Sequence, residues 1–260
     1  MRRDSEGWVE QRTLVTSDGV AISVAYRPQL SSTPQPESGH VFVVAHGFSG
    51  SLSYPGVERV ADTLSDYGAV VGLDFRGHGR SRGLSTLGAA EIYDLDEAVR
   101  WARLLGHQTV TTVGFSMGAA VAVRHAALLG GVDSVVSVSG PSRWYYRGTP
   151  PMRRLHTLVE RRPGRVFARV VMNTRVVEQV VEPLPEEPRE VAGRIAPVPL
   201  LVVHGEQDAF FPVEHARQIA EAHGSADLWV VPGFGHAEAS IDEPLTRRIA
   251  DWAIGQGRAR

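Results

Sequence analysis

The chain of 260 residues contains no cysteine, and all 27 of its basic residues are arginine, so lysine is absent as well. The absence of cysteine excludes a thiol nucleophile, a disulfide framework, an iron–sulfur cluster and a thiolate zinc site. The absence of lysine excludes a Schiff base to pyridoxal phosphate and the phosphate-binding lysine of a P-loop. A covalent mechanism in this chain therefore has to use Ser, Thr, Tyr, His, Asp or Glu.

Excess charge and long apolar runs are also missing. The formal net charge of -2 gives no reason to expect a nucleic-acid partner. No apolar stretch approaches the roughly 18 residues that cross a bilayer, and no apolar run follows Arg2 and Arg3, so neither a membrane span nor a secretory signal is expected. With 43% hydrophobic and 22% charged residues, the composition predicts one globular, enzyme-sized domain. The cytoplasm is its expected location by default.

Short apolar runs alternate with helical patterns along most of the chain. Residues 8–16 and 20–27 are rich in β-forming side chains around Ser17-Asp18-Gly19, which predicts a hairpin, and a surface loop is expected over residues 31–39. Buried strands are predicted at residues 40–45, 69–75, 109–115, 134–138, 200–203 and 228–231. Helices are predicted at residues 57–67, 91–105, 117–129, 213–223 and 244–254. The alternation predicts the α/β class, with a parallel sheet covered on both faces.

The alternation stops between residues 141 and 192, where no buried strand is predicted. Residues 141–180 carry nine arginines against only Glu160 and Glu178, and an acidic stretch follows over residues 182–190. We expect a mostly helical lid at residues 141–192, inserted into a core formed by residues 1–140 and 193–260. Its arginines either steer an anionic substrate or form a solvated helix face, and we favour the second interpretation.

A G-x-S-x-G motif, Gly114-Phe115-Ser116-Met117-Gly118, lies between a predicted strand and a predicted helix. In this context the serine sits on a sharp turn at the carboxyl edge of the sheet, where glycines leave room for the backbone. The start of the following helix directs backbone N–H groups and a positive dipole end toward the same place. Ser116 is therefore the predicted nucleophile.

A serine nucleophile needs a base, and the base needs an orienting acid. His236 follows the predicted strand at 228–231, and Asp208 follows the strand at 200–203, so both are expected at the carboxyl edge beside Ser116. Glu206 is the alternative acid, whereas Asp227 begins a strand and belongs to the opposite edge. The order Ser, Asp, His along the chain is the one expected for this fold.

An acyl-transfer site also needs donors for a developing oxyanion. The backbone N–H groups of Met117 and of Phe48, in His46-Gly47-Phe48, are the predicted donors. Aromatic side chains near the site suggest a pocket for an apolar or aromatic acyl group, although packing of the lid on the core is an equal explanation. The predicted pocket residues are Trp144, Tyr145, Tyr146, Phe210 and Phe211, with Phe48 beside them.

These motifs, together with Asp74-Phe75-Arg76-Gly77-His78-Gly79-Arg80-Ser81, occur in the order found in the α/β-hydrolase superfamily. Over roughly residues 41 to 254 the chain resembles its serine esterase, thioesterase and monoacylglycerol-lipase-like branch. The resemblance implies an eight-stranded, mostly parallel sheet, a triad of Ser116, His236 and Asp208, and a lid at residues 141–192. It also implies a structural role for Arg76 and His78.

The favoured function is hydrolysis of a small-molecule carboxylic ester or thioester through an acyl-enzyme, with no metal or organic cofactor. Two alternatives remain. The same triad acts on another bond in C–C hydrolases, perhydrolases and peptidases, and a catalytically silent protein of this fold binds a ligand without turning it over. The complete set of Ser, His and Asp argues against silence. No oligomeric state is predicted.

Overall fold

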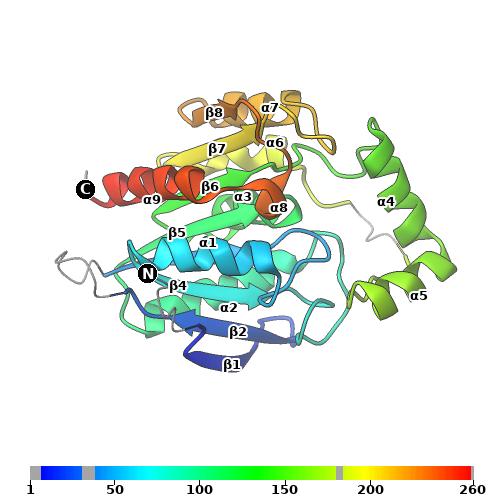
Figure 1. The fold of residues 1–260 in the computed structure, drawn as a ribbon, viewed down its shortest axis with the longest axis horizontal. Helices are drawn as coiled ribbons and strands as arrows, with labels where there is room; N and C mark the ends of the chain where they lie inside the picture. The colour runs from blue at the N-terminus through cyan, green and yellow to red at the C-terminus, as the bar shows by residue number, and fades with distance from the viewer. Residues whose placement is uncertain (1–6, 31–38, 180–183, 259–260) are drawn as a thin grey trace.

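The computed structural model describes residues 7–30, 39–179 and 184–258, so residues 31–38 of the loop predicted at 31–39 lie outside these ranges. Its centre is an eight-stranded sheet with the strand order β1-β2-β4-β3-β5-β6-β7-β8 (Figure 1). The strands are β1 (Glu10–Val15), β2 (Ala21–Arg27), β3 (His40–Ala45), β4 (Ala69–Asp74), β5 (Thr109–Phe115), β6 (Ser134–Val138), β7 (Leu200–Gly205) and β8 (Asp227–Val231). The β1–β2 hairpin joins β4 antiparallel, and the other pairings are parallel. The predicted eight-stranded, mostly parallel sheet is confirmed.

The strands at the middle of the sheet are buried on both faces. Every residue of β3, β4, β6 and β7 is buried, which suits their runs of Val, Leu and Ala because β-branched and aliphatic side chains pack well on a pleated surface. The edge strands β1 and β8 are only partly covered. β7 extends two residues beyond its predicted end, because His204 and Gly205 continue to pair with Val230 and Val231.

Helices cover both faces of the sheet. On one face α1 (Pro55–Ser65), α8 (Ala237–Ser240) and α9 (Glu243–Arg258) pack together around an apolar cluster that includes Leu64 and Ile249. The opposite face carries α2 (Glu91–Leu104), α3 (Met117–Leu128), α6 (Pro188–Val191), the 3-10 helix η1 (Ala192–Ile195) and α7 (Glu214–His223). Two apolar cores, one on each face, therefore hold the sheet rigid beneath its carboxyl edge.

Two helices of the predicted insertion lie apart from these layers. α4 (Pro150–Glu160) and α5 (Arg162–Val171) pack against each other at the right-hand end of Figure 1, opposite to α9. After α5 the chain returns to the core, where Thr174 bridges His78 and Val176 bridges Ser85. α6 lies beside α3 and α7 rather than with α4 and α5. Residues 180–183, within the acidic stretch and the predicted lid, lie outside the described ranges.

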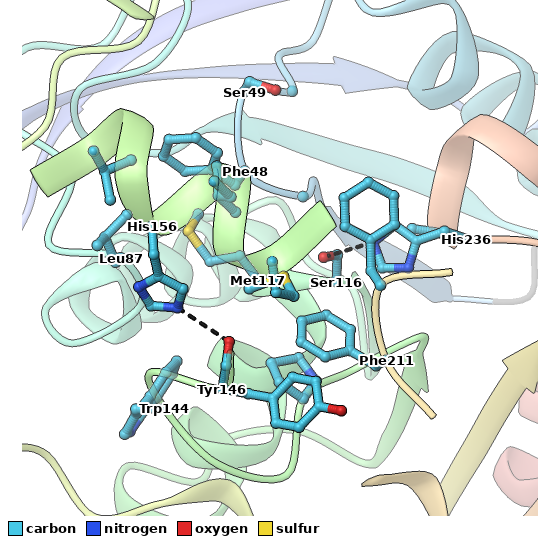
Figure 2. A pocket seen from close by; sticks show the side chains of 18 of the residues that line it. Phe48, Ser49, Leu87, Ser116, Met117, Trp144, Tyr146, His156, Phe211 and His236 are labelled. Atoms are coloured by element: carbon cyan, nitrogen blue, oxygen red, sulfur yellow. Dashed lines mark hydrogen bonds between the residues drawn. The ribbon is translucent and has the colours of Figure 1, made fainter. Parts of the chain in front are cut away.

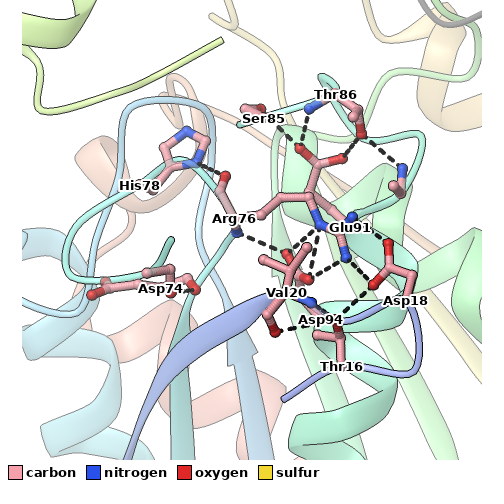
Figure 3. Close-up of polar contacts among 12 residues, drawn as sticks. Thr16, Asp18, Val20, Asp74, Arg76, His78, Ser85, Thr86, Glu91 and Asp94 are labelled. Carbon is pink, nitrogen blue, oxygen red and sulfur yellow. Dashed lines mark hydrogen bonds and ion pairs between the residues drawn. The ribbon is translucent and has the colours of Figure 1, made fainter. Parts of the chain in front are cut away.

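A buried ion-pair network supports the loop that follows β4 (Figure 3). The guanidinium of Arg76 pairs with Asp94 of α2 at 2.7 Å and with Asp18 of the β1–β2 turn at 2.6 Å. Glu91 accepts hydrogen bonds from the Ser85 hydroxyl and from the N–H and hydroxyl of Thr86. A buried ion pair loses much of its attraction to desolvation, but the loss of one partner is costly. The network therefore ties the hairpin, α2 and two loops together.

Candidate active site

Ser116 lies between β5 and α3, at the carboxyl edge of the sheet. Its backbone has φ 50° and ψ -112°, a conformation that non-glycine residues rarely adopt. The flanking glycines make this turn possible, because a Cβ on Gly114 would lie 2.3 Å from the carbonyl oxygen of Gly118. A Cβ on Gly118 would lie 2.2 Å from the carbonyl oxygen of Ala45. The sharp turn directs the serine hydroxyl away from the sheet.

Ser116, His236 and Asp208 form a continuous chain of hydrogen bonds. His236 Nε2 is 3.0 Å from Ser116 Oγ (Figure 2), and His236 Nδ1 is 2.7 Å from Asp208 Oδ2. The three residues follow the carboxyl ends of β5, β7 and β8, so the sheet brings together groups up to 120 positions apart. Glu206, the alternative acid, is exposed and its side chain is not part of this arrangement.

The carboxylate of Asp208 is fully buried and has three backbone or ring partners. Its Oδ1 accepts the N–H groups of Phe210 at 2.8 Å and of Phe211 at 3.0 Å. Burial alone raises the pKa of Asp208. The hydrogen bond and charge of His236, together with the N–H groups of Phe210 and Phe211, outweigh burial, and the net pKa lies below the ordinary value. His204 lies 3.7 Å from the same carboxylate, and burial lowers the pKa of its imidazole.

Aromatic stacking holds the imidazole of His236. The ring of Phe210 is stacked on it, with centroids 4.4 Å apart and an interplanar angle of 28°. The ring of Phe211 also lies against this imidazole, with centroids 5.7 Å apart. The two N–H groups that bind Asp208 thus belong to the residues whose rings contact His236, so one short loop orients both groups.

The loop at residues 46–50 passes directly beside Ser116. A Cβ on Gly47 would lie 3.3 Å from the Cβ of Ser116, so glycine allows this close approach. The N–H of Gly47 donates to Oε1 of Glu238 at 2.8 Å. Burial raises the pKa of Glu238, and the Gly47 hydrogen bond and the nearby His236 partly oppose that shift. Phe48, which follows Gly47, and Met117, which begins α3, both lie at this site.

Sequence reasoning did not find Glu238 or Ser139. Ser139 Oγ accepts the N–H of Ala237 at 3.1 Å and so holds the residue that follows His236. Ser139 and Ala237 both have a positive φ, 54° at Ser139 and 52° at Ala237. Glu238 follows His236 by two positions, and that spacing was the one available signal. Neither Glu238 nor Ser139 belongs to a motif. Each acts through a contact with backbone that is distant in the sequence.

A cavity of about 480 Å³ opens above Ser116, within the range of about 300–1,000 Å³ for small-molecule sites (Figure 2). Its wall is largely apolar. All the predicted aromatic residues line it: Phe48, Trp144, Tyr145, Tyr146, Phe210 and Phe211. α4 contributes Met152, Leu155, His156 and Val159. Of the arginines in the described part of residues 141–180, only Arg143 lines the cavity, where it lies over the ring of Tyr146.

Two further features concern the described residues as a whole. No group of three or more His, Asp or Glu side chains in these ranges is arranged to hold a metal ion. Within the same ranges, no helix has the length and apolar character needed to span a bilayer.

A serine that faces a histidine paired with a buried aspartate, at the carboxyl edge of a parallel sheet, is the arrangement of the serine hydrolases. The chain belongs to the alpha/beta hydrolase family, whose model matches residues 42–247. This membership confirms the resemblance noted in the sequence.

Three proteins illustrate the similarity. A monoacylglycerol lipase of Mycolicibacterium smegmatis is 28% identical over 84% of this chain and 88% of its own length. Esterase LipC of Mycobacterium tuberculosis is 31% identical over 44% of this chain and 28% of its own. The structure of the Pyrococcus furiosus esterase Pf2001 has a TM-score of 0.69 at 21% identity, and the match covers 96% of this chain and 91% of that one.

Proposed function

We propose that this protein is a serine hydrolase that cleaves carboxylic esters of apolar acyl groups. The observation that carries the proposal is the hydrogen-bonded series Ser116–His236–Asp208 at the base of an apolar cavity. The relatives named as a monoacylglycerol lipase and as an esterase support an ester bond as the target. A thioester of the same acyl group fits the same chemistry.

In the proposed reaction, Ser116 Oγ attacks the ester carbonyl carbon while His236 Nε2 takes the hydroxyl proton. The tetrahedral intermediate collapses, the bond to the alcohol oxygen breaks, and His236 returns the proton to the leaving alcohol. Water then attacks the acyl-enzyme with the same histidine as base, which releases the acid and restores Ser116. Asp208 keeps a proton on Nδ1 of His236 and stabilises the imidazolium.

We assign the oxyanion site to the backbone N–H groups of Phe48 and Met117. Met117 begins α3, where free N–H groups and the helix dipole favour negative charge. The Phe48 N–H belongs to the loop that the Gly47–Glu238 hydrogen bond holds beside Ser116. In this proposal Glu238 is a positioning residue, because it acts on the donor through the backbone.

The substrate pocket is assigned to Trp144, Tyr145, Tyr146, Phe210 and Phe211, together with the apolar face of α4. A cavity with this wall favours an alkyl or aromatic acyl group, since burial of apolar surface drives its binding. We propose that α4 and α5, within the predicted lid at residues 141–192, cover this pocket, whereas α6 packs with the core helices α3 and α7.

Labelling with a fluorophosphonate probe tests the proposal. We expect the wild-type protein to label and Ser116→Ala to remain unlabelled, with Ser53→Ala, an exposed serine outside the cavity, as the matched control. Hydrolysis of p-nitrophenyl esters from acetate to laurate then measures the chain-length preference, which we expect to favour apolar chains over acetate. A folded wild-type protein that neither labels nor hydrolyses any of these esters would instead be a ligand-binding member of the family.

A further inference from the structure

The apolar face of α5 points into solvent instead of toward the protein. Its large apolar side chains have exposed fractions of 55% at Val166, 50% at Phe167, 76% at Val170 and 64% at Val171. Amphipathic helices of globular proteins normally bury this face against the core. In α5 the buried position is Ala168, so most of the apolar surface of the helix has no partner among the described residues.

Positive charge borders this apolar face. Arg162 and Arg169 of α5 are exposed, as are Arg161 before it and Arg154 on α4. None of these four is paired with a carboxylate of the described residues. Arg143 alone among the described arginines of residues 141–180 lines the cavity, so the arginine concentration found in the sequence lies mainly on the outer surface.

The same helix pair forms part of the cavity wall. Val159 on α4 and Met172, directly after α5, both line the cavity. Figure 1 shows α4 and α5 side by side at the end of the molecule beyond the sheet. The exposed apolar face and the proposed substrate pocket therefore belong to one structural unit.

We propose that the outer face of α5 docks on an anionic lipid surface. A helix with valine and phenylalanine on one face and arginine beside them lies in the interface plane, with its apolar side chains between the headgroups and the acyl chains. Its arginines bind anionic headgroups, whose charge complements them. This proposal does not depend on the proposed ester hydrolysis. If both hold, docking places the pocket beside the apolar esters of the lipid surface.

A second copy of the chain is the competing occupant of this face. In a two-fold contact through α5, the bordering arginines of one copy would face those of the other, which is electrostatically unfavourable. The face is also one side of a ten-residue helix, whereas stable interfaces bury about 800 Å² on each partner. Charge and size therefore both favour a lipid surface over self-association.

Co-sedimentation with vesicles tests the proposal. The Ser116→Ala variant is used beside the wild type, so that hydrolysis does not alter the lipid and binding is measured separately from catalysis. We expect both proteins to pellet with vesicles that contain phosphatidylglycerol, much less with phosphatidylcholine alone, and less again at high salt.

Two double variants separate the apolar and the charged contributions. Phe167→Ser with Val170→Ser is expected to lower the vesicle partition coefficient about tenfold or more. Arg162→Gln with Arg169→Gln is expected to reduce binding to anionic vesicles and leave binding to phosphatidylcholine unchanged. Leu104→Ser, which removes an apolar side chain 82% exposed on α2, is the matched control and should bind as the wild type does. Circular dichroism melts verify that each variant folds.

Three outcomes contradict the proposal. Wild-type protein that stays in the supernatant with both vesicle types has no such docking face. A Phe167→Ser, Val170→Ser variant that binds as tightly as Leu104→Ser places the docking elsewhere. If light scattering shows that the wild type is a dimer and that the same double substitution converts it to a monomer, the face serves self-association. Failure of ester hydrolysis in an otherwise vesicle-binding protein overturns only the proposed function.

Discussion

Glu238 provides a sharp test of how the proposed oxyanion loop is held. Its Oε1 accepts the Gly47 N–H at 2.8 Å, and only 5% of the residue is exposed. Glu238→Ala leaves that N–H without its partner, at a cost of about 1–3 kcal/mol. Since removal of a whole oxyanion donor lowers kcat about 10²–10³-fold, a displaced Phe48 donor is expected to lower kcat about 10–100-fold. KM should stay within about threefold, because the lost contact acts in the transition state.

Glu238→Gln separates the hydrogen bond from the charge. The amide oxygen can still accept the Gly47 N–H, so we expect kcat within about threefold of the wild type. Burial raises the pKa of Glu238, so the folded protein holds this proton more tightly than the unfolded chain does. Stability is therefore lost as the pH rises from the ordinary value of 4.5 through the raised pKa. The amide cannot ionise, so the melting temperature of Glu238→Gln should exceed that of the wild type at neutral pH but not below pH 4.5.

Steady-state kinetics on p-nitrophenyl butyrate and thermal melts at acidic and neutral pH measure these effects. Glu214→Ala, which removes an exposed glutamate from α7, is the control and should change neither kcat nor KM. Equal kcat values for Glu238→Ala and Glu238→Gln would refute the positioning role. A rise in KM with unchanged kcat in Glu238→Ala would assign the carboxyl to substrate binding instead.

Other substitutions test the remaining supports of the site. Asp208→Asn should lower kcat about 10⁴-fold in the ester assay because the amide favours the wrong tautomer of His236; a loss below tenfold would contradict the orienting role. Arg76→Ala leaves the buried Asp94 without its guanidinium partner, so we expect the free energy of unfolding to fall by about 3–5 kcal/mol. The melting temperature should then fall by roughly 6–20 °C, and an unchanged melt would contradict this. Phe210→Ala removes the ring stacked on His236 and should lower kcat/KM about 2–10-fold, whereas Phe210→Tyr should retain the wild-type value.

The parts of the fold that follow from local sequence were predictable. The valine-rich runs of β3, β5 and β6 have the predicted bounds because strands buried on both faces leave a continuous apolar signal. α9 is less well predicted: it extends from Glu243 to Arg258 rather than over residues 244–254, since helix ends depend on capping and packing more than on the apolar pattern.

The supports of the site are harder to read from sequence. Ser116, His236 and Asp208 follow predicted strands, so the topology of the sheet brings them together. Glu238 acts through a hydrogen bond to a residue 191 positions away, and a single glutamate in the four-residue helix α8 carries no pattern that predicts such a contact. The amphipathic pattern of α5 is present in the sequence, but periodicity alone cannot tell that its apolar face points outward.

The two ends of the α4–α5 hairpin are fastened to the core. Before α4, the hydroxyl of Ser142 binds His215 and Gln218 of α7, and after α5, Thr174 and Val176 bridge the loops around His78 and Ser85. The segment between these anchors is therefore a natural unit for exchange in protein engineering. Grafts between residues 143 and 173 could supply a different pocket wall and outer face while the Ser116, His236 and Asp208 scaffold stays untouched.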